Sequence, residues 1–185
     1  MPYSIAVLVG SLRKDSLNRK LAHTLLGLSP KELALEIVDI GQLALFNQDF
    51  DDQGEPPRPW SAFREHIRQS NGVLFITPEY NRSVPGVLKN AIDVGSRPAG
   101  KSAWKGKPAA IITASPGTLG GFGANHHLRQ MLVALDMPTM QHPEAYISGA
   151  GKLFDENGTL SNDSTREFLN TFLNAYVTWL TRLHE

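Results

Sequence analysis

Residues 5–18 of the chain read IAVLVGSLRKDSLN. The first five are apolar without alternation, which is typical of a strand buried on both faces within a parallel sheet. Gly10 and Ser11 end this run, and a helical pattern of apolar residues begins near Ser16 and continues to residue 28. Ser16 or Asp15 can cap that helix, because a short side-chain oxygen accepts hydrogen bonds from first-turn amides. The stretch therefore predicts a strand, a polar loop and a helix in succession.

The alternation of strand and helix continues to the end of the chain. Further strands are expected at residues 33–40, 72–77 and 108–114, with a fifth beginning at residues 138–141. Further helices are expected at residues 60–71, 86–96, 125–136 and 165–183. This order predicts an α/β fold, an open parallel sheet with helices on both faces. Five strands favour the flavodoxin-like strand order 2-1-3-4-5 over a six-stranded dinucleotide fold. Because no repeat or linker divides the chain, residues 1–185 are expected to form one domain.

Composition limits the classes of function. Lys and Arg number 18, as do Asp and Glu, so the net charge is zero and broad nucleic-acid binding is not expected. The absence of cysteine excludes a disulfide, a thiolate metal site and a cysteine nucleophile. The N-terminus does not read as a signal peptide, and no apolar run approaches the ~20 residues that span a bilayer. We therefore expect a cytoplasmic protein without a membrane or nucleic-acid partner.

Three polar loops follow predicted strands, at residues 10–18, 77–85 and 114–125. All three are rich in Gly, Ser, Asn or Pro. Ligands of open α/β sheets bind beyond the carboxyl ends of the strands, where the strand order reverses. We therefore expect these loops to form one binding site.

The first loop has the features of an anion site. It leads into a helix N-terminus, where free amides and the helix dipole favour negative charge. Ser11, Ser16 and Asn18 add neutral polar groups, and Arg13 supplies a guanidinium suited to phosphate. Neither the Walker pattern nor G-x-G-x-x-G is present. A capped helix start with a solvated Arg13 and Lys14 would contain the same residues, so spacing alone leaves both interpretations open.

The other two loops have backbones suited to a flat ligand. Two prolines stiffen residues 77–86, whose amides, together with Tyr80 or Asn81, can line a heteroaromatic edge. Four glycines in residues 114–123 allow the backbone to come close to a ligand. An ordinary strand-to-helix turn and a flexible surface loop are the respective alternatives.

Three other chemistries are disfavoured. His126 and His127 are adjacent, and neighbouring helical residues point about 100° apart, so they converge poorly on one metal ion. Glu79 could act as a catalytic carboxylate, but the sequence offers it no obvious partner. Ser115 does not stand in a G-x-S-x-G nucleophile elbow. We therefore predict no metal site and no single indispensable catalytic side chain.

Two motifs in order resemble the NADPH-dependent FMN reductase family. The first is Gly10-Ser11-Leu12-Arg13 with Ser16 and Asn18. The second comprises Pro78-Glu79-Tyr80-Asn81, Ser83, Pro85-Gly86 and Leu88-Lys89-Asn90-Ala91-Ile92-Asp93. The resemblance covers nearly the whole chain, and it is greatest to the bacterial quinone and chromate reductase branch.

The resemblance implies a bound flavin mononucleotide (FMN), with NADPH or NADH as co-substrate. The residues that would surround its phosphate are Ser11, Arg13, Ser16, Leu17 and Asn18. Those that would run beside the isoalloxazine ring, largely through their backbone, are Pro78, Glu79, Tyr80 and Asn81. Ser115 and Gly117 would border the ring from the third loop. The chemistry would belong to the flavin, which accepts a hydride from NAD(P)H and then reduces an acceptor.

The resemblance also implies small-molecule acceptors and an oligomer. Quinones are the expected acceptors, with chromate, azo compounds, nitro compounds and free flavin as alternatives. Members of the family are usually dimers or tetramers, so a homodimer or homotetramer is expected. Where the family often has Tyr after Pro-Glu-Tyr-Asn, this chain has Arg82, whose charge could favour anionic acceptors or the phosphate of the nicotinamide cofactor.

A flavodoxin-type electron carrier, which does not itself oxidise NAD(P)H, is the alternative function. Flavodoxins are usually strongly acidic to suit basic redox partners, whereas this chain is neutral. The neutral charge favours the reductase. A phosphate-binding or regulatory protein that merely shares the fold is a third possibility.

Overall fold

The computed structural model describes all residues of the chain, Met1–Glu185. It contains one parallel sheet, made of β1 (Tyr3–Val9), β2 (Leu33–Val38), β3 (Gly72–Thr77), β4 (Ala109–Ala114) and β5 (Ala145–Ile147). The strand order is β2-β1-β3-β4-β5, which confirms the predicted flavodoxin-like fold.

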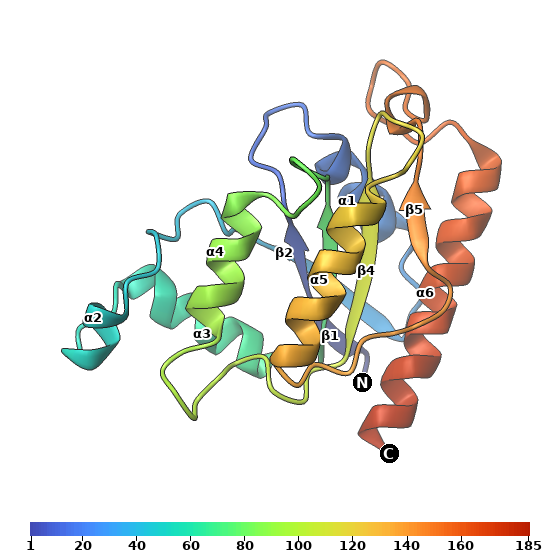
Figure 1. Cartoon of the computed structure of the whole chain (residues 1–185). Coiled ribbons are helices and arrows are strands. Elements are labelled where there is room, and N and C mark those ends of the chain that lie inside the picture. Colours follow the sequence, from blue (N-terminus) through green and yellow to red (C-terminus); the bar gives the residue numbers. More distant parts are fainter.

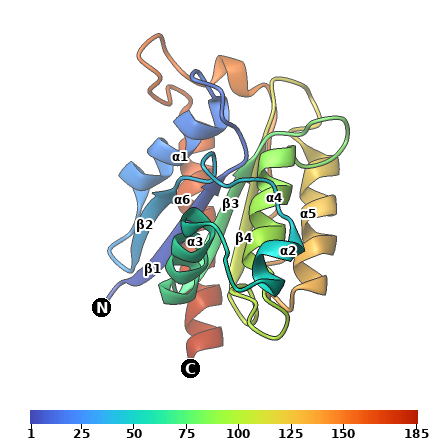
Figure 2. The ribbon, with the colours of Figure 1, turned by 90° about the vertical axis from the view of Figure 1, so that its left-hand side faces the viewer.

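Helices cover both faces of the sheet, as Figures 1 and 2 show. One face is covered by α1 (Leu17–Leu28) and α6 (Asp163–His184). The other face is covered by α3 (Arg58–Gln69), α4 (Gly86–Gly95) and α5 (Phe122–Ala134). A short α2 (Gln48–Asp52) and a 3₁₀ turn, η1 (Ala150–Lys152), lie in connections. None of these helices has the length and apolarity needed to cross a membrane.

The unbroken apolar run of β1 is explained by two cores. Ile5, Val7 and Val9 pack into the core beneath α1 and α6. Ala6 and Leu8 pack into the core on the opposite face. Because successive side chains of a strand point to opposite faces, a strand between two helical layers needs apolar residues at every position.

The predicted start of the fifth strand was wrong. Residues 138–141 contribute only an isolated parallel bridge between Thr139 and Ala109, and the strand itself is β5, farther along the chain. Pro143 separates the two, and proline has no amide hydrogen to donate to a strand ladder. Because β5 runs parallel to β4, the loop that follows β5 lies at the same end of the sheet as the three predicted loops.

The connection between β2 and β3 is more ordered than its sequence indicated. It contains α2, and α3 begins at Arg58 rather than Trp60. Arg64 of α3 pairs with Asp51 of α2 at 2.7 Å, and both side chains are only 4% exposed. The Arg64 Nε atom also donates to the Val94 carbonyl at 2.8 Å. These bonds fasten the connection to α3 and α4, so it is not a free loop.

Side chains close the amino end of the sheet. The hydroxyl of the buried Tyr176 lies 3.1 Å from the carbonyl oxygens of both Val73 and Pro108. The Asn71 side chain accepts a hydrogen bond from the Ser4 amide at 2.8 Å. Polar groups at this end are therefore satisfied within the protein.

Candidate functional site

Four loops meet at the carboxyl end of the sheet, which is the upper end in Figure 1, and follow β1, β3, β4 and β5. A pocket of about 380 Å³ lies between the first two. It is lined by Gly10, Ser11, Leu12, Arg13, Tyr80, Pro85, Gly86 and Val87. The strand order reverses between β1 and β3, so the pocket lies where open α/β sheets bind their ligands.

The first loop ends in a capped helix. The Ser16 Oγ atom accepts a hydrogen bond from the Arg19 amide at 3.2 Å, as expected of an N-cap. The amides of Leu17 and Asn18 precede the first possible intrahelical donor and remain for another acceptor. Arg13 is exposed in the pocket, so a guanidinium and a helix N-terminus lie on the same loop.

Gly10 allows the first and second loops to come close together. Its amide donates to the Ile76 carbonyl at 2.9 Å. A Cβ atom at Gly10 would lie only 2.2 Å from Oγ1 of Thr77, which is fully buried. No residue with a side chain can occupy this position unless β1 or β3 shifts.

Asn18 joins the first loop to the third. Its side-chain amide donates to the Ala114 carbonyl at 3.1 Å, and the residue is 3% exposed. The Asn18 Oδ1 atom is buried without a hydrogen-bond partner. A buried carbonyl oxygen without a donor is uncommon in a folded protein, so a ligand or water is the expected partner.

The second loop contains a tight turn. Tyr80 and Ser83 exchange two backbone hydrogen bonds, of 2.9 and 3.0 Å. The two residues between them, Asn81 and Arg82, have φ values of 51° and 67°. Left-handed backbone at two successive non-glycine residues is costly and is held by the surrounding structure. The turn leaves the Tyr80 side chain 45% exposed and lining the pocket.

Glu79 has one partner within its own loop and one that lies far away in the sequence. Its Oε2 atom accepts a hydrogen bond from the Ala124 amide at 3.1 Å, in the first turn of α5. Its Oε1 atom lies 3.3 Å from the Arg82 guanidinium. The carboxylate thus caps α5 from the second loop. The Ala124 partner lies 45 residues away in the sequence, so no local pattern could have identified it.

The third loop packs against the loop that follows β5. The Ser115 amide donates to the Ile147 carbonyl, and the Gly149 amide donates to the Gly117 carbonyl, both at 3.1 Å. Ser148 Oγ donates to the Thr118 carbonyl at 2.7 Å. Sequence reasoning missed residues 148–152 because it placed the fifth strand too early. The local signal was limited to the apolar triplet 145–147, which Ser and Gly follow and which is too short to show a periodic pattern.

The two neighbouring histidines make separate contacts. His126 Nε2 lies 3.1 Å from the Tyr146 hydroxyl, whereas His127 Nδ1 lies 3.1 Å from Ser83 Oγ. Burial, with a contribution from Glu144, raises the pKa of Tyr146 to about 12. Tyr146 is therefore protonated at neutral pH, and its hydroxyl can donate to His126.

The predicted site residues lie in the pocket, at the start of α1 and in the second and third loops. Ser11, Arg13 and Tyr80 line the pocket between the first and second loops. Ser16, Leu17 and Asn18 begin α1 beside it, while Pro78, Glu79 and Asn81 form the second loop. Ser115 and Gly117 lie in the third loop, which Asn18 connects to the first through the Ala114 carbonyl.

Known proteins resemble the chain over nearly its full length. Residues 3–152 match the family described as NADPH-dependent FMN reductase. A quinone reductase from Pseudomonas putida is 61% identical, with 96% of this chain and 95% of that protein aligned. A 2-hydroxy-1,4-benzoquinone reductase from Burkholderia sp is 47% identical, with 97% of each protein aligned.

A solved structure is also similar. FerB, a flavoenzyme NAD(P)H:(acceptor) oxidoreductase from Paracoccus denitrificans, is 41% identical and superimposes with a TM-score of 0.90. The alignment covers 97% of this chain and 98% of FerB.

Proposed function

Because the chain belongs to the NADPH-dependent FMN reductase family and is an NAD(P)H-dependent flavin oxidoreductase, we propose that it reduces quinones with FMN held between its first two loops. The observation that carries this proposal is the pocket at the strand-order reversal, where flavodoxin-like proteins bind FMN. The quinone reductases among its relatives support the choice of acceptor. When bound, FMN supplies the hydride and electron transfer.

The first loop fits the phosphate of FMN. The free amides of Leu17 and Asn18, the dipole of α1 and the Arg13 guanidinium all favour an anion. Ser16 is already engaged with the Arg19 amide, so we assign it chiefly to holding the helix start. Because Gly10 has no side chain, the start of this loop can lie directly against Thr77 at the end of β3.

Asn18 fits the hydroxyl-bearing tail of FMN better than its phosphate. One hydrogen of its amide nitrogen is donated to the Ala114 carbonyl, and the buried Oδ1 atom, which has no partner, can only accept a hydrogen bond. A phosphate is also an acceptor, whereas the ribityl hydroxyls are donors. We therefore assign Asn18 to joining the loops and to accepting a hydrogen bond from that tail.

The second and third loops fit the ring of FMN. The strained turn at residues 80–83 holds its backbone in one shape, and the half-exposed Tyr80 side chain offers an aromatic edge. Pro78, Asn81, Ser115 and Gly117 are proposed to border the ring through their backbone. The Glu79 carboxylate accepts a hydrogen bond from the Ala124 amide, so we propose that it holds the second loop against α5 and takes no part in proton transfer.

Arg82 gives a specific prediction about the co-substrate. Its guanidinium is 74% exposed and is partly offset by Glu79 at 3.3 Å. We expect Arg82→Tyr to lower the preference for NADPH over NADH, or for anionic over neutral acceptors, by a few-fold. Steady-state kinetics with both nicotinamides and with chromate and a neutral quinone measures this. Unchanged preferences would remove Arg82 from any role in specificity.

We further propose a cytoplasmic homodimer or homotetramer, because NAD(P)H is available in the cytoplasm and an apolar surface lies beside the site. Leu119 lies within the third loop and Phe122 begins α5, and they are 56% and 51% exposed. Neighbouring large apolar side chains on a surface favour association. Light scattering on the purified protein measures the oligomeric state, and a monomer at micromolar concentration would contradict the proposal.

One experiment tests the function. The purified protein should be yellow, NADPH or NADH should bleach its flavin absorbance, and a quinone should restore the colour. A panel of quinones, chromate, azo and nitro compounds and free flavin then ranks the acceptors. A yellow protein that neither nicotinamide bleaches would be an electron carrier. A colourless protein that cannot be reconstituted with FMN would contradict both functions.

A further inference from the structure

A second hollow, of about 290 Å³, lies beside the first loop, beyond the carboxyl ends of β1 and β2. Its apolar wall is formed by Val9, Leu12, Ile37, Val38 and Ile40. Leu12 also lines the proposed FMN pocket, so the two hollows share a wall. A ligand that extends past the first loop would enter this hollow.

Three ionisable side chains line the same hollow: Arg19, His23 and Asp39. Neither Arg19 nor His23 takes part in any ion pair of the structure. Asp39 Oδ1 accepts a hydrogen bond from the Gly41 amide at 2.8 Å, which fixes the carboxylate and leaves Oδ2 available. The hollow therefore combines an apolar wall with one arginine and one histidine that make no ion pair, and with one positioned carboxylate.

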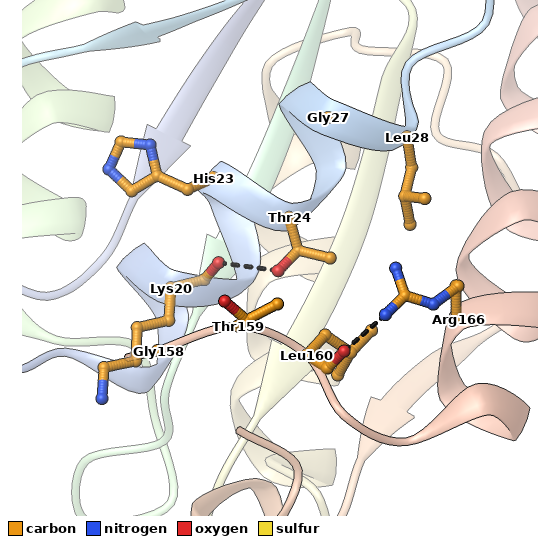
Figure 3. A pocket seen from close by; sticks show the side chains of 9 residues that line it. All are labelled: Lys20, His23, Thr24, Gly27, Leu28, Gly158, Thr159, Leu160 and Arg166. Atoms are coloured by element: carbon orange, nitrogen blue, oxygen red, sulfur yellow. Dashed lines mark hydrogen bonds between the residues drawn. The ribbon is translucent and has the colours of Figure 1, made fainter. Parts of the chain in front are cut away.

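A neighbouring hollow on the other side of α1 is a weaker candidate. It also contains cations, Lys20 and Arg166, and it shares His23. Figure 3 shows that the side chains of Lys20 and His23 extend away from Arg166, whose guanidinium donates to the Leu160 carbonyl. Because these side chains do not point toward a common position, that hollow is not suited to binding an anion.

We propose that the hollow beside β2 binds the adenosine phosphate end of NADPH or NADH, an inference that rests on the proposed function. The apolar wall suits the adenine ring, and Asp39 can accept a hydrogen bond from a ribose hydroxyl. Arg19 and His23 suit a phosphate, with Arg19 as the stronger partner because it is always charged. Dinucleotide folds hold adenosine at the same place, beside an acidic residue that follows the second strand.

The chain lacks the motif G-x-G-x-x-G. A separate adenosine site would allow the chain to bind a dinucleotide without that motif. The fingerprint brings a pyrophosphate against the first loop. Here that loop is assigned to the phosphate of FMN. The adenosine end of the nicotinamide cofactor would then be held outside that loop.

Titration calorimetry with the FMN-loaded protein tests this site. The probes are adenosine 2′,5′-bisphosphate, which carries the 2′-phosphate of NADPH, and ADP, which carries the pyrophosphate of both cofactors. We expect Arg19→Glu to weaken binding of at least one probe about tenfold. An effect on the bisphosphate alone assigns Arg19 to the 2′-phosphate, and an effect on both probes assigns it to the 5′-phosphates. No binding to the unaltered protein, or equal binding to the variant, would overturn the proposal.

Two further variants keep the result interpretable. Arg58→Glu makes the same charge change at an exposed arginine outside the hollow and should bind both probes normally. Asp39→Asn keeps an oxygen for the Gly41 amide but removes the charge, and it should weaken both probes about threefold through the ribose contact. Probe binding unaffected by Asp39→Asn would remove the ribose assignment and count against the site.

Flavin content separates this proposal from the proposed function. All three variants should retain FMN and should be bleached by saturating NAD(P)H, with KM raised in the Arg19 variant and kcat retained. If the variants behave like the unaltered enzyme in every respect, the adenosine site fails while the reductase stands. If the unaltered protein holds no FMN, the function itself fails.

Discussion

The two ends of the sheet use their polar groups in opposite ways. At the amino end, the Tyr176 hydroxyl and the Asn71 side chain are hydrogen-bonded within the protein. At the carboxyl end, Asn18 keeps a buried oxygen without a partner, and Asn81 and Arg82 hold a strained turn. Both ends are carried by the same five strands. The difference indicates that the amino end serves stability and that the carboxyl end is built for a ligand.

The largest expected effect is that of Gly10→Ala. The new Cβ atom would meet Thr77 Oγ1 at 2.2 Å, so the first loop must move away from β3. We expect FMN affinity to fall about a hundredfold, or about 3 kcal/mol. Fluorescence titration of the apoprotein with FMN measures it. Gly27→Ala is the control, because nothing lies within 4 Å of its added Cβ atom. Equal FMN affinity in both variants would contradict the close approach.

Tyr176→Phe should lower the stability of the protein without changing its affinity for FMN. Removing the hydroxyl takes a buried donor from the Val73 and Pro108 carbonyls, and we expect the free energy of unfolding to fall by about 2 kcal/mol. FMN affinity should not change. Urea unfolding measures the loss, with Tyr3→Phe as a control near zero because its hydroxyl has no hydrogen bond. A loss of FMN affinity in Tyr176→Phe would break the division between the two ends.

Alkaline pH should lower the free energy of unfolding, with the largest contribution from Tyr176 at the amino end. Burial raises the pKa of Tyr176 far above its ordinary value of 10.0, so the group ionises in the unfolded chain before it does in the folded one. The unfolded state then binds fewer protons, and the free energy of unfolding should fall by about 1.4 kcal/mol per pH unit above about pH 10. Tyr146 adds a loss of the same sign between 10.0 and about 12.

Comparing the unaltered protein with Tyr176→Phe isolates this contribution. Lys107 opposes it below pH 10.5, because partial burial lowers its pKa and stability then rises as the pH approaches that value. Urea unfolding at several values between about pH 9 and pH 11 should give a shallower fall for the variant. Parallel curves would show that Tyr176 does not control alkaline stability.

The smallest expected effect is that of replacing Ser16, which we expect to contribute both to the stability of the fold and to the binding of FMN. Ser16→Ala removes the cap from α1, and we expect a loss of about 1 kcal/mol in the free energy of unfolding. FMN affinity should fall only a few-fold, because the amides of Leu17 and Asn18 are retained. Ser61→Ala, an exposed helical serine without a side-chain hydrogen bond, is the control. A hundredfold loss of FMN affinity would instead make the Ser16 hydroxyl a main phosphate ligand.

The sequence predicted those parts of the fold that local physics decides. β3 was predicted with its observed bounds, because an apolar run on both faces lies between a polar stretch and Pro78. Ser16 or Asp15 was predicted as the cap of α1 for the same local reason, and the structure selects Ser16. β5 was misplaced because three residues are too few to give a periodic signal.

The rest of the site depends on contacts between distant residues. The partner of Glu79 is an amide 45 residues away, and the partner of Asn18 is a carbonyl 96 residues away. No pattern within either loop encodes such a contact. The sequence could therefore name the loops of the site, but not the bonds that hold them together.

Those bonds have a consequence for how a ligand would be received. Asn18 ties the first loop to the third, and Glu79 ties the second loop to α5, which begins where the third loop ends. The loops thus lose most of their conformational entropy when the chain folds. A flavin that arrives later need not order them, so a larger share of its contact energy remains as affinity. Apart from the free amides of Leu17 and Asn18, the amides of these loops should therefore exchange almost as slowly in the unligated protein as in the complex, with protection already present before FMN is added.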